Sequence, residues 1–254
     1  DKYYLPNFDD SKWNNSKERK YVDYKFQKQK IKSLKYEELN PRKINNDNLF
    51  DLKQEVVGYP YLIIRGQKGQ IINIKCAEEL NDDGEIRFDE RCNCRYIEKW
   101  TLSGDIDTFV PYTYKAFRYI KIESNLPFEL IKIKIIARHY PFKDKYKYHS
   151  DNKKLNQIYK LAKNTIKYGV QDSFLDCPSR EKGQYFGDGV YSSLTHILLT
   201  KDDSLYKKFI IDAFSSMKID KCMTAQGPCS YYQTIAEFPL YIVISLKYYL
   251  LLTG

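Results

Sequence analysis

The stretch that decides the fold is ELIKIKIIAR, Glu129–Arg138, together with the residues after Pro141, because the hydrophobic period changes between them. In the first part, isoleucines alternate with lysines, which is the period-two pattern of a strand with one buried face. Beyond Pro141, apolar residues recur at steps of three and four, which is typical of amphipathic helices. We therefore predict a β domain followed by an all-helical domain.

Upstream of Arg138, the chain consists of short β-branched and aromatic runs separated by turn signals such as Lys68-Gly69 and Asp83-Gly84. The alternation is clear at Ile72, Ile74 and Cys76, which share one predicted face. The candidate strands are Tyr61–Gly66, Gln70–Leu80, Glu85–Glu90, Cys94–Leu102, Phe117–Ser124 and Glu129–Arg138. About six or seven strands at such close spacing predict an antiparallel β-sandwich.

Four helical stretches are expected in the second half of the chain. The first follows the possible caps at His149-Ser150-Asp151 and runs for about twenty residues. Its predicted apolar face consists of Leu155, Ile158, Leu161, Ala162, Ile166 and Val170. The other three are expected at Gly189–Thr200, Ser204–Ser215 and Ile235–Leu252, with Pro239 in the first turn of the last. We expect this helical domain to continue past Gly254.

Composition places the chain among globular proteins. Its 254 residues are 43% hydrophobic and 15% aromatic, which is enough to build one or two cores and argues against disorder. No apolar run reaches the roughly 18 to 20 residues that a transmembrane helix needs, so we predict no membrane partner. The chain opens DKYYLPNFDD without a Met or a signal segment, and we expect it to be part of a longer protein.

The positive charge is local. The net charge is +9, and residues 1–45 contribute +5 of it. Within them, KFQKQKIKSLKY, Lys25–Tyr36, could be a nucleic-acid face or a solvated edge strand or linker. We favour the edge or linker interpretation because no nucleic-acid motif accompanies the charge.

Three parts of the chain are predicted. Residues 1–45 are a linker or the tail of an upstream domain, residues 46–140 are the β-sandwich, and residues 141–254 are the helical part.

The cysteines do not predict a metal site. Cys92 and Cys94 form a C-x-C pair that Cys76 could join, but the spacing is not the C-x-x-C of zinc sites and no histidine is near. We predict no protein-built metal site and no cofactor. Thiols of this kind suit a reducing compartment, so we expect the cytoplasm, with secretion as the alternative.

The chemistry is concentrated in DSFLDCPSREKGQYFGDG, Asp172–Gly189, between the first two predicted helices. The candidate site residues are Asp176, Arg180, Glu181, Tyr185 and Asp188. Carboxylates bind sugar hydroxyls, aromatic rings stack on the apolar face of a sugar, and one protonated carboxyl can donate its proton to a leaving oxygen. We expect Asp176 and Asp188 to raise the pKa of Glu181 by charge repulsion. From composition alone, an exposed loop with its own ion pairs is an equally good interpretation.

The identity of the motif favours catalysis. DCPSREKGQYFGDG resembles the signature of the α-L-rhamnosidases of glycoside hydrolase family 78, an Asp-Cys-Pro-x-Arg-(x)-Glu run followed by Gly-Trp and Gly-Asp. GQIINIKCAEELNDDGEI and KAFRY, Lys115–Tyr119, resemble landmarks of the β-sandwich that precedes the catalytic domain in this family. IAEFPLYIVISLKYYLLLTG resembles a later barrel helix.

This resemblance implies an antiparallel β-sandwich followed by an incomplete (α/α)6 barrel that hydrolyses terminal α-L-rhamnosides with inversion. It places Glu181 at the general acid, and Asp176, Arg180 and Asp188 in the rhamnose site. The family's general base comes from the far half of the barrel and has no counterpart in this chain, so we expect these residues to be inactive alone. The implied partner is a rhamnose-containing carbohydrate.

The loop also departs from the family pattern. Lys182, Gly183, Gln184, Tyr185 and Phe186 stand where the family shows Arg, an apolar residue, Gly, Trp and a small residue. Tyr185 can still stack on a sugar, although the sugar's identity becomes less secure. The alternative function is therefore a non-catalytic carbohydrate-binding or structural relative of the same fold.

Overall fold

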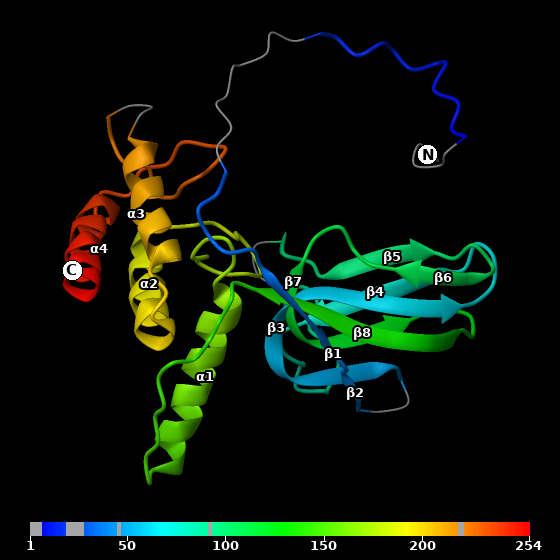
Figure 1. The fold of residues 1–254 in the computed structure, drawn as a ribbon. Helices are drawn as coiled ribbons and strands as arrows, with labels where there is room; N and C mark the ends of the chain where they lie inside the picture. The colour runs from blue at the N-terminus through cyan, green and yellow to red at the C-terminus, as the bar shows by residue number, and fades with distance from the viewer. Residues whose placement is uncertain (1–6, 19–27, 45–46, 91–92, 218–220) are drawn as a thin grey trace.

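The computed structural model describes residues 7–18, 28–44, 47–90, 93–217 and 221–254. Strands lie on one side of the molecule and helices on the other, which confirms the predicted class of a β-sandwich followed by helices (Figure 1). The strands are β1 Lys35–Leu39, β2 Arg42–Lys43, β3 Leu49–Arg65, β4 Ile71–Ala77, β5 Ile97–Thr101, β6 Ile106–Phe109, β7 Lys115–Glu123 and β8 Glu129–His139. The helices are α1 Lys153–Gly169, α2 Phe186–Thr200, α3 Ser204–Ser216 and α4 Phe238–Thr253.

The long strand β3 builds the sandwich by taking part in both of its layers. Its first part pairs with β7, which continues through β4 to β5. Its last part pairs with β8 on one side and β6 on the other, and β8 continues to β1. Gly58 is the residue where the change occurs, since it pairs with Lys115 of β7 and with Ala137 of β8.

The core lies between the two layers. The predicted inward face of β4 is confirmed, because Ile72, Ile74 and Cys76 are buried in one apolar cluster. The predicted alternation is wrong for Ile131, which is 43% exposed. The register between β3 and β8 shifts at this point, with Ile63 opposite Lys132 and Ile64 opposite Leu130, so Ile131 is the extra residue of a bulge and turns outward.

Two predicted strand assignments differ from the structure. Glu85–Glu90 forms isolated bridges, Leu80 to Ile86 and Asp89 to Arg95, and no named strand. Its charged side chains form ion pairs across the loop, while Ile86 packs with Leu49 and Ala77 beside the sheet. The sequence patterns did not indicate β6, and of Lys25–Tyr36 only the last two residues enter β1, an edge strand beside β8. Residues 25–27 lie outside the described part of the chain.

Helix α1 begins later than predicted. Its cap is Asn152, whose side-chain oxygen accepts hydrogen bonds from the backbone N–H groups of Lys154 and Leu155. Much of its predicted apolar face points outward, since Leu155, Ile158 and Leu161 are each at least 44% exposed. The last turn of α1 packs against the sandwich instead, where Tyr168 is part of the apolar core.

The other three helices form close to their predicted bounds and enclose a second core. Phe174, Phe186 and Phe209 pack edge to face in its centre, and Ile242 of α4 closes it. Pro239 lies in the first turn of α4, as predicted. None of the helices described is both long and apolar enough to cross a membrane.

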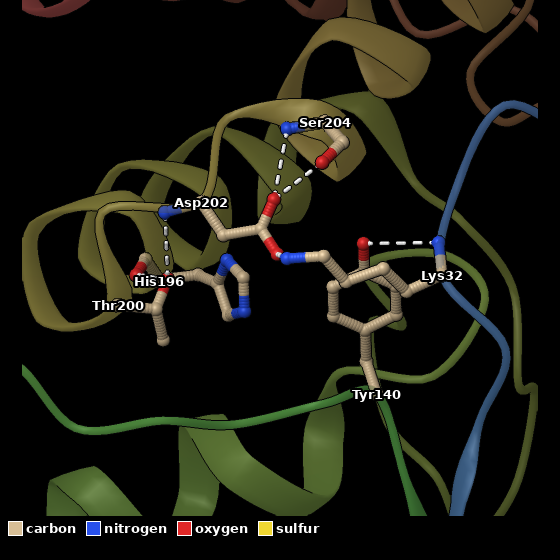
Figure 2. Close-up of polar contacts among 6 residues, drawn as sticks. All are labelled: Lys32, Tyr140, His196, Thr200, Asp202 and Ser204. Carbon is tan, nitrogen blue, oxygen red and sulfur yellow. Dashed lines mark hydrogen bonds and ion pairs between the residues drawn. The ribbon is translucent and has the colours of Figure 1, made fainter.

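Residues 28–39 contact both the helices and the sandwich, and Figure 2 shows the contacts of Lys32 on the helical side. Lys32 forms an ion pair with Asp202 at the turn between α2 and α3, with 2.5 Å between Nζ and Oδ2, and its backbone N–H donates to the hydroxyl of Tyr140. Seven residues further on, Leu39 ends the edge strand β1 on the sandwich. Beside the ion pair, burial lowers the pKa of His196 to about 4, so its ring is neutral at neutral pH.

Candidate active site

The motif loop connects α1 to α2 and is closed at its base by backbone hydrogen bonds. The N–H of Asp176 donates to the carbonyl of Gly183 over 2.8 Å, and the N–H of Gly183 donates back to Oδ1 of Asp176 over 2.9 Å. Lys182 N–H donates to the carbonyl of Cys177. This closure holds Arg180 and Glu181 on a short projecting turn.

Glu181 and Asp176 form the centre of the loop. A hydrogen bond between their carboxyl groups raises the pKa of Glu181, and partial burial and the negative charges of Asp176 and Asp188 raise it further. Arg180 opposes this shift, with 3.5 Å between its Nη2 and Oε2 of Glu181. The pKa of Glu181 is thus raised, as expected, although the hydrogen bond with Asp176 contributes more to the shift than charge repulsion does.

Asp188 lies in the first turn of α2, where the partial positive charge of the helix end favours an anion. Arg180, Glu181 and Asp188 are exposed, and Asp176 is half-buried. A cation, an acidic side chain with a raised pKa and a second carboxylate are therefore exposed to solvent in and next to this loop. Such a group can bind hydroxyls and supply a proton.

Tyr185 lies next to this group and is half-buried. Its hydroxyl is 3.2 Å from the hydroxyl of Tyr231 and 3.4 Å from Oε1 of Gln233. Tyr231 and Gln233 belong to the segment between α3 and α4, which sequence analysis did not assign to the site. The tyrosine pair Tyr231-Tyr232, close to a Gly-Pro turn, is the only signal that could have drawn attention to it.

A buried glutamine attaches that segment to the motif loop. The side-chain N–H groups of Gln184 donate to Oδ2 of Asp212 over 2.9 Å and to the carbonyl of Gly227 over 2.6 Å. The backbone of Tyr185 also bridges to Gln226. The site is therefore built from the motif loop and the α3–α4 segment, and only the first was predicted.

Two clefts border the loop on its sandwich side. One of about 850 Å³ is lined by Asp176 and Pro178, by one face of α1, and by sandwich residues such as Glu55 and Glu78. A smaller one of about 270 Å³ is lined by Arg180. Glu181 is exposed and is not among the lining residues of these two clefts.

Asp176, Cys177 and Glu181 bring one ligand atom each within 4.8 Å of the others. Exposed carboxylates often approach this closely without a cation, and the hydrogen bond between Asp176 and Glu181 already accounts for the spacing. We assign no metal to this group.

Cys76 is buried in the sandwich, where burial raises its pKa to about 12, and Cys92 lies outside the described residues.

The β-sandwich and the helices each match a domain model from a class of carbohydrate-cleaving enzymes, the glycosidases. The family model of the bacterial alpha-L-rhamnosidase concanavalin-like domain matches residues 42–140, and that of the bacterial alpha-L-rhamnosidase 6 hairpin glycosidase domain matches residues 144–250. Between them these two matches cover most of the chain. The chain belongs to the bacterial α-L-rhamnosidase family, glycoside hydrolase family 78.

Relatives agree with this assignment. An α-L-rhamnosidase of Formosa agariphila is 26% identical over 227 residues, which are 83% of this chain and 24% of that protein. The α-L-rhamnosidase structure from Dictyoglomus thermophilum has a TM-score of 0.78 at 20% identity and covers 96% of this chain and 29% of its own. A Klebsiella oxytoca rhamnosidase with rhamnose bound has a TM-score of 0.74 at 14% identity, over 86% of this chain and 52% of its own.

Proposed function

We propose that this chain carries the acid half of the active site of an inverting α-L-rhamnosidase. Glu181 donates a proton to the glycosidic oxygen, while Asp176, Arg180 and Asp188 bind the sugar hydroxyls and Tyr185 stacks on the ring. The observation that supports this best is the position of Glu181 beside Asp176, with their carboxylate oxygens within 4.8 Å, because this neighbour raises the pKa of Glu181 and so favours its protonated form. The two family matches, and the rhamnose bound to the Klebsiella oxytoca enzyme, support the sugar class.

The general base of this mechanism is proposed to lie outside the 254 residues. Inversion requires a second carboxylate roughly 6.5 to 9.5 Å from the acid, with a water between them. The chain spans 24% of the length of the Formosa relative. Exposed apolar rows on α1, and on α4 at Leu240, Val243 and Leu251, fit a surface on which further helices pack.

We therefore expect the full-length protein to hydrolyse a nitrophenyl α-L-rhamnoside and the 254-residue chain alone to leave it intact. Release of nitrophenol is measured for both at equal concentration. Turnover by the isolated chain would show that the base lies within it. No turnover by the full-length protein on any α-L-rhamnoside would overturn the proposed activity.

Asp176→Asn is expected to move the alkaline limb of the pH–rate profile of the full-length enzyme to lower pH. A general acid works only while protonated, and its raised pKa extends activity upward in pH. The substitution removes the negative charge of Asp176 that helps to raise the pKa of Glu181, so Glu181 is expected to lose its proton at lower pH. The profile of kcat against pH measures this, and an unmoved or alkaline-shifted limb would contradict it.

We also propose a reducing compartment, the cytoplasm, for this protein. The five cysteines that the structure describes, Cys76, Cys94, Cys177, Cys222 and Cys229, are free thiols. Localisation of the tagged full-length protein by cell fractionation tests this.

A further inference from the structure

The residue after the proposed acid has an unusual backbone. Lys182 has a φ of +56°, in the left-handed region that residues with a Cβ avoid. Non-glycine residues remain in that region when their surroundings hold them there. Lys182 follows Glu181 directly and precedes Gly183, whose N–H is bonded to Asp176. Whatever holds Lys182 therefore also sets the direction of the Glu181 side chain.

Besides the backbone hydrogen bond to Cys177, the β-sandwich holds Lys182 by its side chain. Nζ of Lys182 donates to the carbonyl of Tyr114 over 2.7 Å and lies 4.1 Å from the centre of the Tyr114 ring. The guanidinium of Arg138 lies 4.4 Å from the same ring centre. Arg138 is itself fixed, since it donates to the hydroxyl of Tyr59 over 3.1 Å and to Oε1 of the buried Gln171 over 2.9 Å. We call Arg138, Tyr114 and Lys182 the cation–ring stack.

A second contact from the sandwich holds the other side of the turn. The hydroxyl of Tyr96 donates to the carbonyl of Ser179, and Sγ of Cys94 is 3.7 Å from the same oxygen. Ser179 precedes Glu181 by two residues and Lys182 follows it. The proposed acid thus sits between two points at which its backbone is attached to the β domain.

We propose that the sandwich positions Glu181 against Asp176 through the cation–ring stack, with Lys182 and Tyr114 as positioning residues. The side chains of the stack contact one another and the sandwich, so their proposed effect on Glu181 is indirect. The charges that act on Glu181 are those of Asp176, Arg180 and Asp188, whereas the ammonium of Lys182 is directed at Tyr114. Only the catalytic role of Glu181 rests on the proposed function. The position of Glu181 relative to Asp176 is a property of the chain without substrate.

The test is the titration of Glu181 in the 254-residue chain, followed by carboxyl ¹³C NMR in Lys182→Met and Lys182→Arg. We expect Lys182→Met to lower the pKa of Glu181 toward its ordinary value, because the freed turn no longer holds the two carboxyls together. Loss of a nearby cation alone would raise that pKa, so the sign separates repositioning from a charge effect. Lys182→Arg retains the donor and the cation over the ring, and we expect it to keep the raised pKa.

A matched control is Lys201→Met. Lys201 is also a left-handed lysine, with a φ of 60°, but it caps α2 at an exposed position. It is expected to leave Glu181 unchanged. Should Lys182→Met fail to fold, Tyr114→Leu removes the ring and keeps the carbonyl, with Tyr114→Phe as its conservative partner. An unchanged Glu181 titration in the folded member of these two disruptive variants would overturn the proposal.

The same samples separate this inference from the proposed function. An L-rhamnose titration followed by NMR tests sugar binding, while the Glu181 titration uses no sugar. Absence of rhamnose binding with a lowered pKa in Lys182→Met would leave the positioning intact and count against the sugar assignment. The opposite result is that the unmodified chain binds rhamnose and the pKa of Glu181 is unchanged in both disruptive variants. It would reject the positioning role of the stack and leave the sugar assignment intact.

Discussion

Replacing Glu181 by Gln is expected to lower kcat of the full-length enzyme about 10²- to 10⁴-fold on rhamnosides with a poor leaving group. The amide has nearly the same size and can still accept a hydrogen bond, but it has no proton to donate to the departing oxygen. Binding of L-rhamnose is expected to change little, because the other side chains that line the site remain. Steady-state kinetics and a binding isotherm measure the two effects separately.

Glu237→Gln provides a matched control. Glu237 is an exposed carboxylate of the same helical domain, at the start of α4, and we assign it no part in the chemistry. Its substitution is expected to leave kcat and rhamnose binding unchanged. Near-normal turnover in Glu181→Gln, or an equal loss in both variants, would end the assignment of the acid.

Gly58→Ala is expected to destabilise the sandwich by about 3 kcal/mol or more, in the range of severe overpacking. A Cβ at Gly58 would lie 2.2 Å from the carbonyl oxygen of Ile136 and 2.8 Å from Cα of Ala137. Both are backbone atoms of β8, so neither can turn aside. Because Gly58 is where β3 leaves β7 for β8, the strain falls on the junction of the two layers.

Chemical denaturation of the 254-residue chain measures this, with Gly169→Ala as the control. Gly169 ends α1, and a Cβ there meets nothing within 4 Å. It should be neutral, or stabilising by up to about 1 kcal/mol through helix propensity. If Gly58→Ala were as stable as the unmodified chain, the close approach of β3 and β8 at this glycine would be wrong.

The fold was predictable where one short segment carries the whole signal. The inward face of β4 and the bounds of α2, α3 and α4 follow from local periodicity. The full length of β3 could not be predicted from periodicity, because Gln54 and Glu55 interrupt its apolar run and Pro60 is unusual inside a strand. Pro60 is tolerated where β3 is paired on one side only.

The carboxylates of the candidate site could be chosen from the sequence because they lie in one continuous motif. Gln226 and Tyr231 could not, since they reach the loop from a segment about forty residues later and only the folded chain brings them to Tyr185. The same holds for Tyr114, which contacts Lys182 from 68 residues away. Residues that support a site from another domain leave no pattern in the linear sequence.

The central claim is that Glu181 donates a proton to the leaving oxygen, and the dependence on the leaving group tests it most directly. Rates of Glu181→Gln and of the unmodified full-length enzyme are compared on a rhamnosyl disaccharide and on a dinitrophenyl rhamnoside, whose leaving group departs without protonation. We predict a large loss on the disaccharide and a small one on the dinitrophenyl substrate. Equal losses on both substrates would contradict a role for Glu181 as the general acid.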